Sequence, residues 1–472
     1  MQLTAITSAP GATTGASDAR GASGASLVSA ASSLRATLAA ATAALLAPGL
    51  VAAQTTSAAQ WQVDSAVLVY QEGGGRVRAV EPVISARRTD GNDRTVGLKL
   101  TLDALTGASP NGAAPQPTAQ TFTSPSGDSR YTTPAGKSPL DPNFRDRRVA
   151  LAGTLERPWG TAQRLSLAAN VSSETDFKSL SLSAGLARDF NQKNTTLSLT
   201  LALEADRIEA QGGVPTGLRP LRAGGDGDGG GRGGDDDDDR DDDEHEGGAS
   251  RTVADVLLGV TQVINRHWLM QTNIGYGRSS GNHDDPYKIL SVVDGSTGLL
   301  VGDRYVSESR PDSRSRLSVY WQNKLHLTQD VVDLSYRFYR DDWGVRAHTL
   351  DLRYRLELGA GLYLEPHLRL HQQSKADFSQ GWLVEGQGWN SSTQTANVAN
   401  ASADPRLAAF TAQTLGAKFG MPLGRGGELT ARLEFYRQTP KALAGAPGAL
   451  RTLELTPTLK ATTVMLGYAL PW

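Results

Sequence analysis

Apolar and polar residues alternate along much of the chain from residue 62 onward. In the stretch 95–105, valine or leucine occupies each even position from 96 to 102, and glycine, lysine, threonine and aspartate occupy the odd positions from 97 to 103. The stretches 197–204 and 350–358 repeat this arrangement. Because successive side chains of a strand point to opposite faces, a period of two predicts strands with one apolar and one polar face.

The pattern predicts about sixteen strands, each roughly ten to thirteen residues long, which is the length that a tilted strand needs to cross a bilayer. Strands of soluble proteins are usually nearer five or six residues. The predicted strands lie near 62–71, 76–88, 95–105, 146–156, 162–173, 178–189, 195–206, 252–264, 267–278, 314–326, 331–340, 346–358, 361–373, 407–419, 427–438 and 458–470.

The connections between these strands differ in length according to their parity. Every even-numbered connection is short, and the long ones, near 106–145, 207–251, 279–313, 374–406 and 439–457, are all odd-numbered. Outer-membrane barrels have short periplasmic turns and long external loops, whereas a soluble sandwich has no reason to segregate its loops in this way. The sequence therefore predicts an all-β transmembrane antiparallel β-barrel of about sixteen strands over residues 61–472.

The two ends of the chain support export to the outer membrane. Residues 1–53 are predicted to be a leader and signal peptide, with Arg35, an apolar run and small residues before a cut after Ala53, followed by a short periplasmic segment, 54–60. The alternatives are a short Ala-rich amphipathic helix and, for the long leader, a true start codon further downstream. Tyr468, Leu470 and Trp472 share one face of the last strand and resemble the signal read by the barrel-insertion machinery. We therefore expect that machinery, periplasmic chaperones and outer-membrane lipid as partners.

Composition narrows the possible chemistry. The 472 residues include 51 glycines and no cysteine, which excludes disulfides, thiolate metal sites, cysteine nucleophiles and a lipoprotein anchor. No stretch approaches eighteen unbroken apolar residues, the minimum for a membrane-spanning helix. The formal charge is −2, but the segment 226–246 holds twelve acidic residues against two arginines, so the remainder is mildly basic. That excess is dispersed along the strands, which gives nucleic-acid binding little support.

The acidic segment lies in the predicted external loop 207–251, and its Gly/Asp composition predicts disorder. Carboxylates at this density attract cations, so a weak, non-specific cation site is expected at Asp235, Asp236, Asp237, Asp238 and Asp239, with loose Ca²⁺ association. The segment lacks the EF-hand spacing. A solvated low-complexity insertion without a ligand is the favoured alternative. No other metal or cofactor is predicted.

If the leucine faces point to lipid, the opposite faces line a charged lumen. The candidates for lining it are Lys99, Asp103, Arg316, Lys324, Arg337, Asp351, Arg353, Arg355, Glu357, Glu365, His367, Arg369, His371, Arg432 and Glu434. Charges within a membrane span often mark a functional site, but in a wide barrel the favoured interpretation is that they face water or pair across the lumen. His367 and His371 lie roughly 13 Å apart on one strand at ~3.3 Å per residue, too far to bind one metal ion.

Between Arg310 and Phe378 the chain is similar to a known family, domain of unknown function 3570 of Gram-negative bacteria. The residues that carry the resemblance are Arg310–Arg314, Tyr336–Gly344, His348–Leu350, Leu364–Arg369 and Gln373–Phe378. The resemblance implies an uncharacterised outer-membrane barrel, and the gene neighbourhoods of the family imply a periplasmic redox partner. It assigns no catalytic residue, and the acidic insertion departs from the family pattern.

Two parts of the shared motif fall at the predicted outer mouth. Asp341, Asp342 and Trp343 lie in a short external turn, and Asp377 lies at the start of a long loop. This clustering indicates either a docking or ligand site or, as the favoured interpretation, turn chemistry in which Asp and Gly meet backbone requirements.

Three functions remain open from the sequence. The leading one is a non-enzymatic barrel, either a pore or conduit or a sleeve for a periplasmic partner. The second is an enzyme that uses His367 or His371 with a carboxylate, although no Gly-x-Ser-x-Gly nucleophile motif is present. The third is a surface cation-binding or adhesion protein that acts through the acidic loop.

Overall fold

The computed structural model describes residues 61–123, 130–210, 213–221 and 248–471. The predicted leader 1–53, the segment 54–60, Asp235–Asp239 and Trp472 lie outside the described residues. Among the described residues no helix is long and apolar enough to cross a membrane.

Sixteen antiparallel strands form one closed barrel, which confirms the predicted fold class. In order around the barrel the strands are β1 (Trp61–Glu72), β2 (Arg78–Thr89), β3 (Thr95–Pro110), β6 (Leu140–Pro158), β7 (Gln163–Glu174), β8 (Phe177–Phe190), β9 (Thr195–Ile208), β10 (Ala249–Asn265), β11 (Trp268–Gly281), β14 (Ser313–His326), β15 (Val331–Asp341), β16 (Arg346–Gly359), β17 (Leu362–Gln373), β21 (Phe410–Leu423), β22 (Gly427–Pro440) and β23 (Leu459–Pro471). Pairing of β1 with β23 closes the sheet, so the barrel has no unpaired edge.

The outer face of the barrel is apolar along its strands. Leu98 of β3, Leu151 of β6 and Leu203 of β9 are 52%, 55% and 65% exposed. The residues that alternate with the leucines on each of these strands point to the other face and are largely covered. Exposed leucine is unfavourable in water and favourable in hydrocarbon, so this face is suited to lipid. The last strand follows the same rule, with Val464, Leu466 and Tyr468 exposed on the outside.

The connections divide the barrel into a turn end and a loop end. At the turn end every connection has five residues or fewer, and β1 begins and β23 ends there. At the loop end the connections 111–139, 209–248, 282–312, 374–409 and 441–458 are long. The predicted separation of short turns from long loops is therefore present in the structure.

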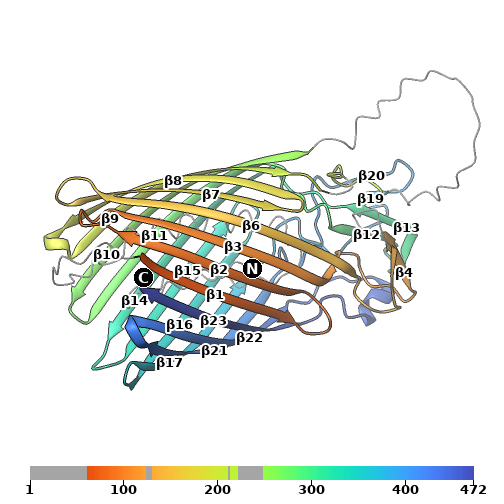
Figure 1. The fold of residues 1–472 in the computed structure, drawn as a ribbon. Coiled ribbons are helices and arrows are strands. Elements are labelled where there is room, and N and C mark those ends of the chain that lie inside the picture. Colours follow the sequence, from red (N-terminus) through yellow and green to blue (C-terminus); the bar gives the residue numbers. More distant parts are fainter. Residues whose placement is uncertain (1–60, 124–129, 211–212, 222–247, 472) are drawn as a thin grey trace, which may run out of the picture.

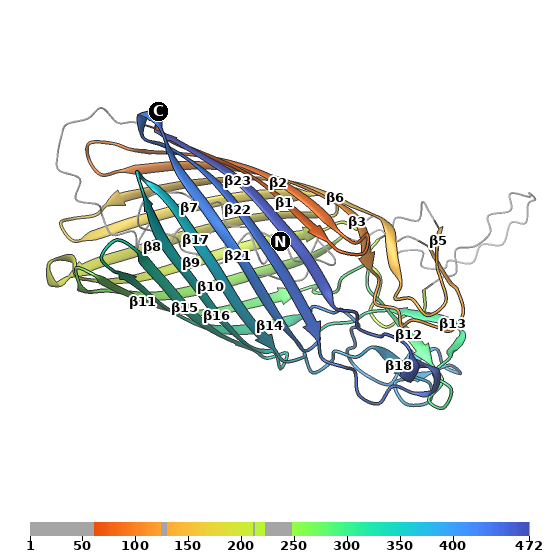
Figure 2. The ribbon, with the colours of Figure 1, turned by 90° about the horizontal axis from the view of Figure 1, so that it is seen from below.

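The loop end carries structure that the sequence did not predict. The loops contain β4 (Gln120–Thr123), β5 (Arg130–Thr133), β12 (Ile289–Val293), β13 (Leu300–Ser307), β18 (Trp382–Val384), β19 (Trp389–Asn390), β20 (Thr395–Ala396) and the 3₁₀ helix η3 (Gly448–Thr452). Figures 1 and 2 show these elements gathered at one end of the barrel. β12 pairs with β13 and, in parallel, with β18 of a different loop. We call this folded assembly of loops the cap.

The cap has its own apolar core. Leu290, Val292, Leu383 and Trp389 are at most 1% exposed and pack together. Burial of this cluster stabilises a fixed arrangement of loops that are far apart in the sequence. A correction to one predicted boundary follows: the strand expected at 407–419 begins at Phe410, because Leu407 turns into the cap with its amide bonded to the Asp404 carbonyl at 3.0 Å.

Candidate functional site

The structure places all fifteen lumen candidates on the inner face of the barrel, opposite the exposed leucines. Asp351, Arg353, Glu365, His367, Arg369, Arg432 and Glu434 are buried, and the other eight are partly covered. Alternation alone orients these side chains, because each lies one position from a residue that faces outward.

The densest charge cluster lies on the neighbouring strands β16, β17, β21 and β22. His367 is at its centre, with Nε2 3.0 Å from Asp351 Oδ2 and Nδ1 2.9 Å from Glu434 Oε1. Neutral imidazole has a single N–H, so only the doubly protonated ring can donate to both carboxylates. Both ring nitrogens are then occupied within the protein, which leaves no ring nitrogen of His367 for a substrate.

Arginines surround this histidine. Arg353 Nε lies 3.4 Å from Asp351 Oδ1, and Arg432 Nη1 donates to Glu434 at 3.2 Å. Arg432 also lies 3.6 Å from Glu365 Oε1, and Arg369 lies 3.9 Å from Asp351. The cluster therefore alternates in sign across the wall, an arrangement in which each buried charge has a partner.

The remaining lumen candidates make local contacts along the wall. Arg316 binds Asp255 at 2.9 Å, Lys324 lies 3.7 Å from Asp333, and Asp103 pairs with Arg148. Arg355 donates to Glu357 at 2.6 Å with its guanidinium 3.6 Å from the centroid of the Tyr363 ring. Arg337 lies over Tyr320, and His371 Nδ1 is 2.8 Å from Thr349 Oγ1. Lys99 is on the same face as Asp103.

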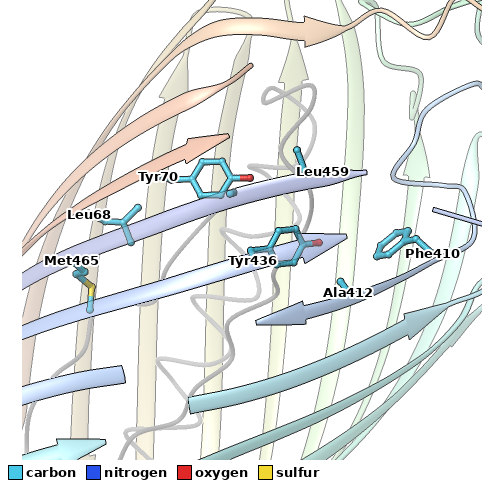
Figure 3. Close-up of a cluster of buried hydrophobic side chains, with 8 residues drawn as sticks. Leu68, Tyr70, Phe410, Ala412, Tyr436, Leu459 and Met465 are labelled. Atoms are coloured by element: carbon cyan, nitrogen blue, oxygen red, sulfur yellow. The ribbon is translucent and has the colours of Figure 1, made fainter. Parts of the chain in front are cut away.

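An apolar patch interrupts the charged wall near the loop end. Figure 3 shows Leu68 and Tyr70 of β1 beside Tyr436 of β22, Leu459 of β23 and Phe410 of β21. Tyr70 donates to Glu72 at 3.0 Å and Tyr436 donates to Gln438 at 2.7 Å, so the rings have apolar faces and satisfied hydroxyls. We call these residues, with Ala412, Ala461 and Met465, the inner apolar patch.

The rim of the loop end gathers the predicted mouth residues. Asp341 accepts hydrogen bonds from Arg314 Nε at 2.9 Å and from the Val345 amide at 2.9 Å, and Asp342 accepts one from the Ser315 amide at 2.9 Å. The carboxylates of this turn are therefore committed to turn and inter-strand bonds. These are the contacts that turn chemistry requires.

Trp343 anchors the loop that follows β17. Its ring is 4% exposed, stacks under the Arg314 guanidinium at 4.3 Å and meets Phe378 edge-on at 5.1 Å. The Trp343 carbonyl accepts the Asp377 amide at 2.8 Å. The two predicted mouth segments thus contact each other, although they are separated by more than thirty residues in the sequence.

The cap holds a second charge cluster, which the sequence analysis did not identify. Asp285, Glu308 and Asp404 are 1% exposed. Arg406 donates to Asp285 at 2.6 Å and to Asp404 at 2.8 Å, and Arg310 binds Glu308 at 2.6 Å and Asp404 at 2.8 Å. These bonds join the loop 282–312 to the loop 374–409. We call the five residues the cap cluster.

Burial changes the protonation of groups around the cap cluster. It raises the pKa of Asp284 to about 6 and that of Glu308 to about 7, although Arg310 acts in the opposite direction on both. Burial, together with the positive charge of Arg251, lowers the pKa of His283 to about 3. For Asp404 burial acts to raise the pKa, but the charges of Arg406 and Arg310 prevail and hold it below its ordinary value.

Between the cap and the inner wall lies a pocket of about 110 Å³. Its lining comes from Arg76 in the β1–β2 turn, the loop 111–139 with the strand ends on either side of it, the loop 374–409, and the loop 441–458 with the strand ends on either side of it. Leu459 belongs both to this pocket and to the inner apolar patch. The run 289–293 is apolar apart from Ser291 although it lies in a predicted loop, and it was the signal in the sequence that could have indicated a folded cap and hence such a pocket.

Among the described residues no group of His, Asp and Glu side chains is arranged to hold a metal ion.

Comparison with known sequences places the chain in a family. The profile of DUF3570, described as a protein of unknown function, matches residues 35–470. The chain belongs to this family. The DUF3570 motifs now have positions: Arg310 lies in the cap cluster, Arg314 and Trp343 at the rim, and His367 in the wall. No curated protein matches the chain.

Solved structures with a similar form are outer-membrane proteins of low sequence identity. Outer membrane protein opdK of Pseudomonas aeruginosa is 9% identical over 88% of this chain and 99% of its own, with a TM-score of 0.38. OccK2 (OpdF) of the same organism is 9% identical over 88% and 98%, with a TM-score of 0.36. CdiB from Acinetobacter baumannii is 8% identical over 86% and 60%, with a TM-score of 0.40. Overlap this low assigns no role to the chain.

Proposed function

We propose that this DUF3570 protein is an outer-membrane conduit for a small hydrophilic solute and that its loop end is covered by the cap. The observation that carries the proposal is the charged inner wall within an apolar outer surface. Sixteen strands enclose a space wider than the side chains of the wall alone fill, and porins of this size hold water. Arg353 and Glu365 belong to a cluster of both signs on that wall, and charges inside a membrane span often mark the path of a solute.

The first test is conductance of the folded, full-length protein. The protein is extracted from membranes, its folded state is established by a shift between cold and boiled electrophoresis, and it is inserted into planar bilayers. Discrete conductance steps from the heat-modifiable species are the expected result. A folded barrel without conductance would exclude the open conduit and favour the alternative role as a sleeve for a periplasmic partner.

A matched pair of variants tests whether ions pass along the charged wall. Glu365 and Arg432 lie 3.6 Å apart, so removing either charge alters the same place on the wall with opposite sign. Glu365→Gln should move the reversal potential in a salt gradient towards anion selectivity, and Arg432→Gln should move it towards cation selectivity. Shifts in the same direction, or none in either variant, would contradict a path along these residues.

A further inference from the structure

We infer that the pocket between the cap and the inner wall binds a small organic anion with an apolar body. This goes beyond the proposed conduit, because binding in the pocket can be measured whether or not the barrel conducts. Three observations carry the inference: the size of the pocket, the chemistry of its walls, and an arginine whose terminal nitrogens have no partner among the described residues.

The size of the pocket limits its ligand. It encloses about 110 Å³. An apolar cavity of roughly 150 Å³ accommodates a benzene molecule, so this pocket suits an apolar body of about four to six carbons.

The walls of the pocket are mostly apolar and rigid. Prolines contribute from every loop that meets there, among them Pro115, Pro405 and Pro457, and Trp382 and Leu443 complete the apolar surface. A proline ring fixes its backbone torsion, so these walls lose little conformational entropy when a ligand binds. A preformed apolar surface of this kind favours a hydrocarbon body.

One positive group on the wall supplies the charge preference. Arg76 donates through Nε to Glu72 at 3.0 Å, and no partner is recorded for its two terminal nitrogens among the described residues. Glu72 is itself engaged by Tyr70 of the inner apolar patch at 3.0 Å, so the arginine is held in place. A carboxylate or sulfonate beside these nitrogens would gain charge-assisted hydrogen bonds.

The acidic group that also lines the pocket does not cancel this preference. Asp404 receives hydrogen bonds from Arg310 and from Arg406, each at 2.8 Å, and Arg406 is a lining residue too. Arg310 and Arg406 also bind Glu308 and Asp285, and the charge of buried Lys288 acts on all three carboxylates. Three cations thus balance three carboxylates, so the side of the pocket formed by the cap is not negative. The polar lining as a whole favours an anion over a cation.

Calorimetric titration of the folded full-length protein in nanodiscs tests the inference with three probes of one apolar body: pentanoate, pentan-1-ol and pentylammonium. Empty nanodiscs provide the blank. Pentanoate should bind at least tenfold more tightly than either other probe. Equal binding of pentanoate and pentylammonium, or no heat above the blank for any probe, would overturn the inference.

Two sets of variants locate the site. Arg76→Gln should weaken pentanoate binding at least fivefold, whereas Arg346→Gln, which alters an exposed arginine at the same end of the barrel, should leave it unchanged. Leu443→Asp and Leu443→Asn differ only in charge, so the first should abolish pentanoate binding and admit pentylammonium, and the second should do neither. Each variant is first shown to be heat-modifiable. Unchanged pentanoate affinity in both Arg76→Gln and Leu443→Asp would refute the assignment.

Discussion

Arg316 and Asp255 belong to strands that are not neighbours, yet Arg316 Nη2 lies 2.9 Å from Asp255 Oδ2. Between them runs β11, whose Gly277 is in register with both residues. Side chains two strand spacings apart, about 9.6 Å, meet most readily where the residue between them has no side chain. The same arrangement joins His367 to Glu434 across Gly416 of β21. Glycine on the inner wall therefore allows ion pairs to bridge a strand.

Replacing Gly277 with a larger residue should break the ion pair between Arg316 and Asp255. A Cβ at Gly277 would lie 1.8 Å from Asp255 Oδ1 and 2.7 Å from Arg316 Nε, so one of the two side chains must move. Gly277→Ala should lower the free energy of unfolding by about 1–3 kcal/mol, as overpacking usually does. The measurement is the urea concentration at which the folded band disappears in cold electrophoresis.

Gly153→Ala is the control for this substitution. A Cβ at Gly153 meets only Leu98 Cδ2, at 3.9 Å, which is ordinary contact. Its midpoint in urea should equal that of the natural protein. If Gly277→Ala were as stable as Gly153→Ala, the bridged ion pair would have no part in holding the wall.

His367 should stabilise the folded barrel mainly by placing a positive charge between two carboxylates. His367→Leu leaves Asp351 and Glu434 facing one another without the positive charge between them, and we expect a loss of about 3–5 kcal/mol. Adding Glu434→Gln removes one of the exposed charges and should restore part of that loss. Urea midpoints of the single and double variants measure the effect, and a double variant less stable than His367→Leu would contradict this account.

Alternation was sufficient to predict the barrel because each strand obeys a single local rule. In β16, Leu350 and Leu352 face outward and Asp351 and Arg353 face inward, and a shift by one residue would reverse all of them. The predicted strand ends differ from the observed ones mainly where strands run on into the cap, as in β6, which begins at Leu140 rather than near 146.

The alternation of apolar and polar residues could not predict the cap or the pairing of charges. Arg406 and Asp285 are more than a hundred residues apart, and neither lies in an alternating stretch. Their contact depends on how two loops fold against each other, which involves non-local packing rather than a repeat. For the wall, the sequence predicted which face His367 occupies, but its bond to Glu434 depends on register across Gly416.

Acid should loosen the rim through His283, because burial lowers the pKa of this side chain to about 3. The ring accepts from Ser279 and donates to the Gly281 carbonyl, bonds that the neutral form makes. Because the folded pKa lies below the ordinary 6.5, this stability is present above pH 6.5 and is lost as pH falls towards 3. The equilibrium constant for local opening of the rim should therefore rise by up to roughly tenfold for each unit that the pH falls in that window.

Hydrogen exchange of the segment 282–312 at pH 7 and pH 4.5, corrected for intrinsic rates, measures this loosening. His283→Gln does not titrate, so its exchange should change less than that of the natural protein. Asp284, with a pKa raised to about 6, acts in the opposite sense, since its contribution is lost as pH rises through 6. The difference between the two proteins therefore isolates the histidine, and equal acid responses would exclude it.

The cap should open when its central arginine is removed. Arg406→Gln leaves Asp285 and Asp404 buried without their shared cation, a change that costs about 3–5 kcal/mol when one partner of a buried pair is lost. The barrel strands do not depend on this cluster, so the variant should stay heat-modifiable. Trypsin should then cleave the loops at the exposed Lys375 and Lys441 at least tenfold faster than in the natural protein.

Two further variants decide whether charge is the cause. Asp285→Asn added to Arg406→Gln removes one of the two uncompensated carboxylates and should slow cleavage again. Arg340→Gln, at an exposed arginine of β15 near the same rim, should cleave at the natural rate. If the conduit conducts, Arg406→Gln should also conduct more, because the folded loops no longer cover the mouth. Faster cleavage without increased conductance would mean that the cap stabilises the loop end but does not limit passage through the barrel.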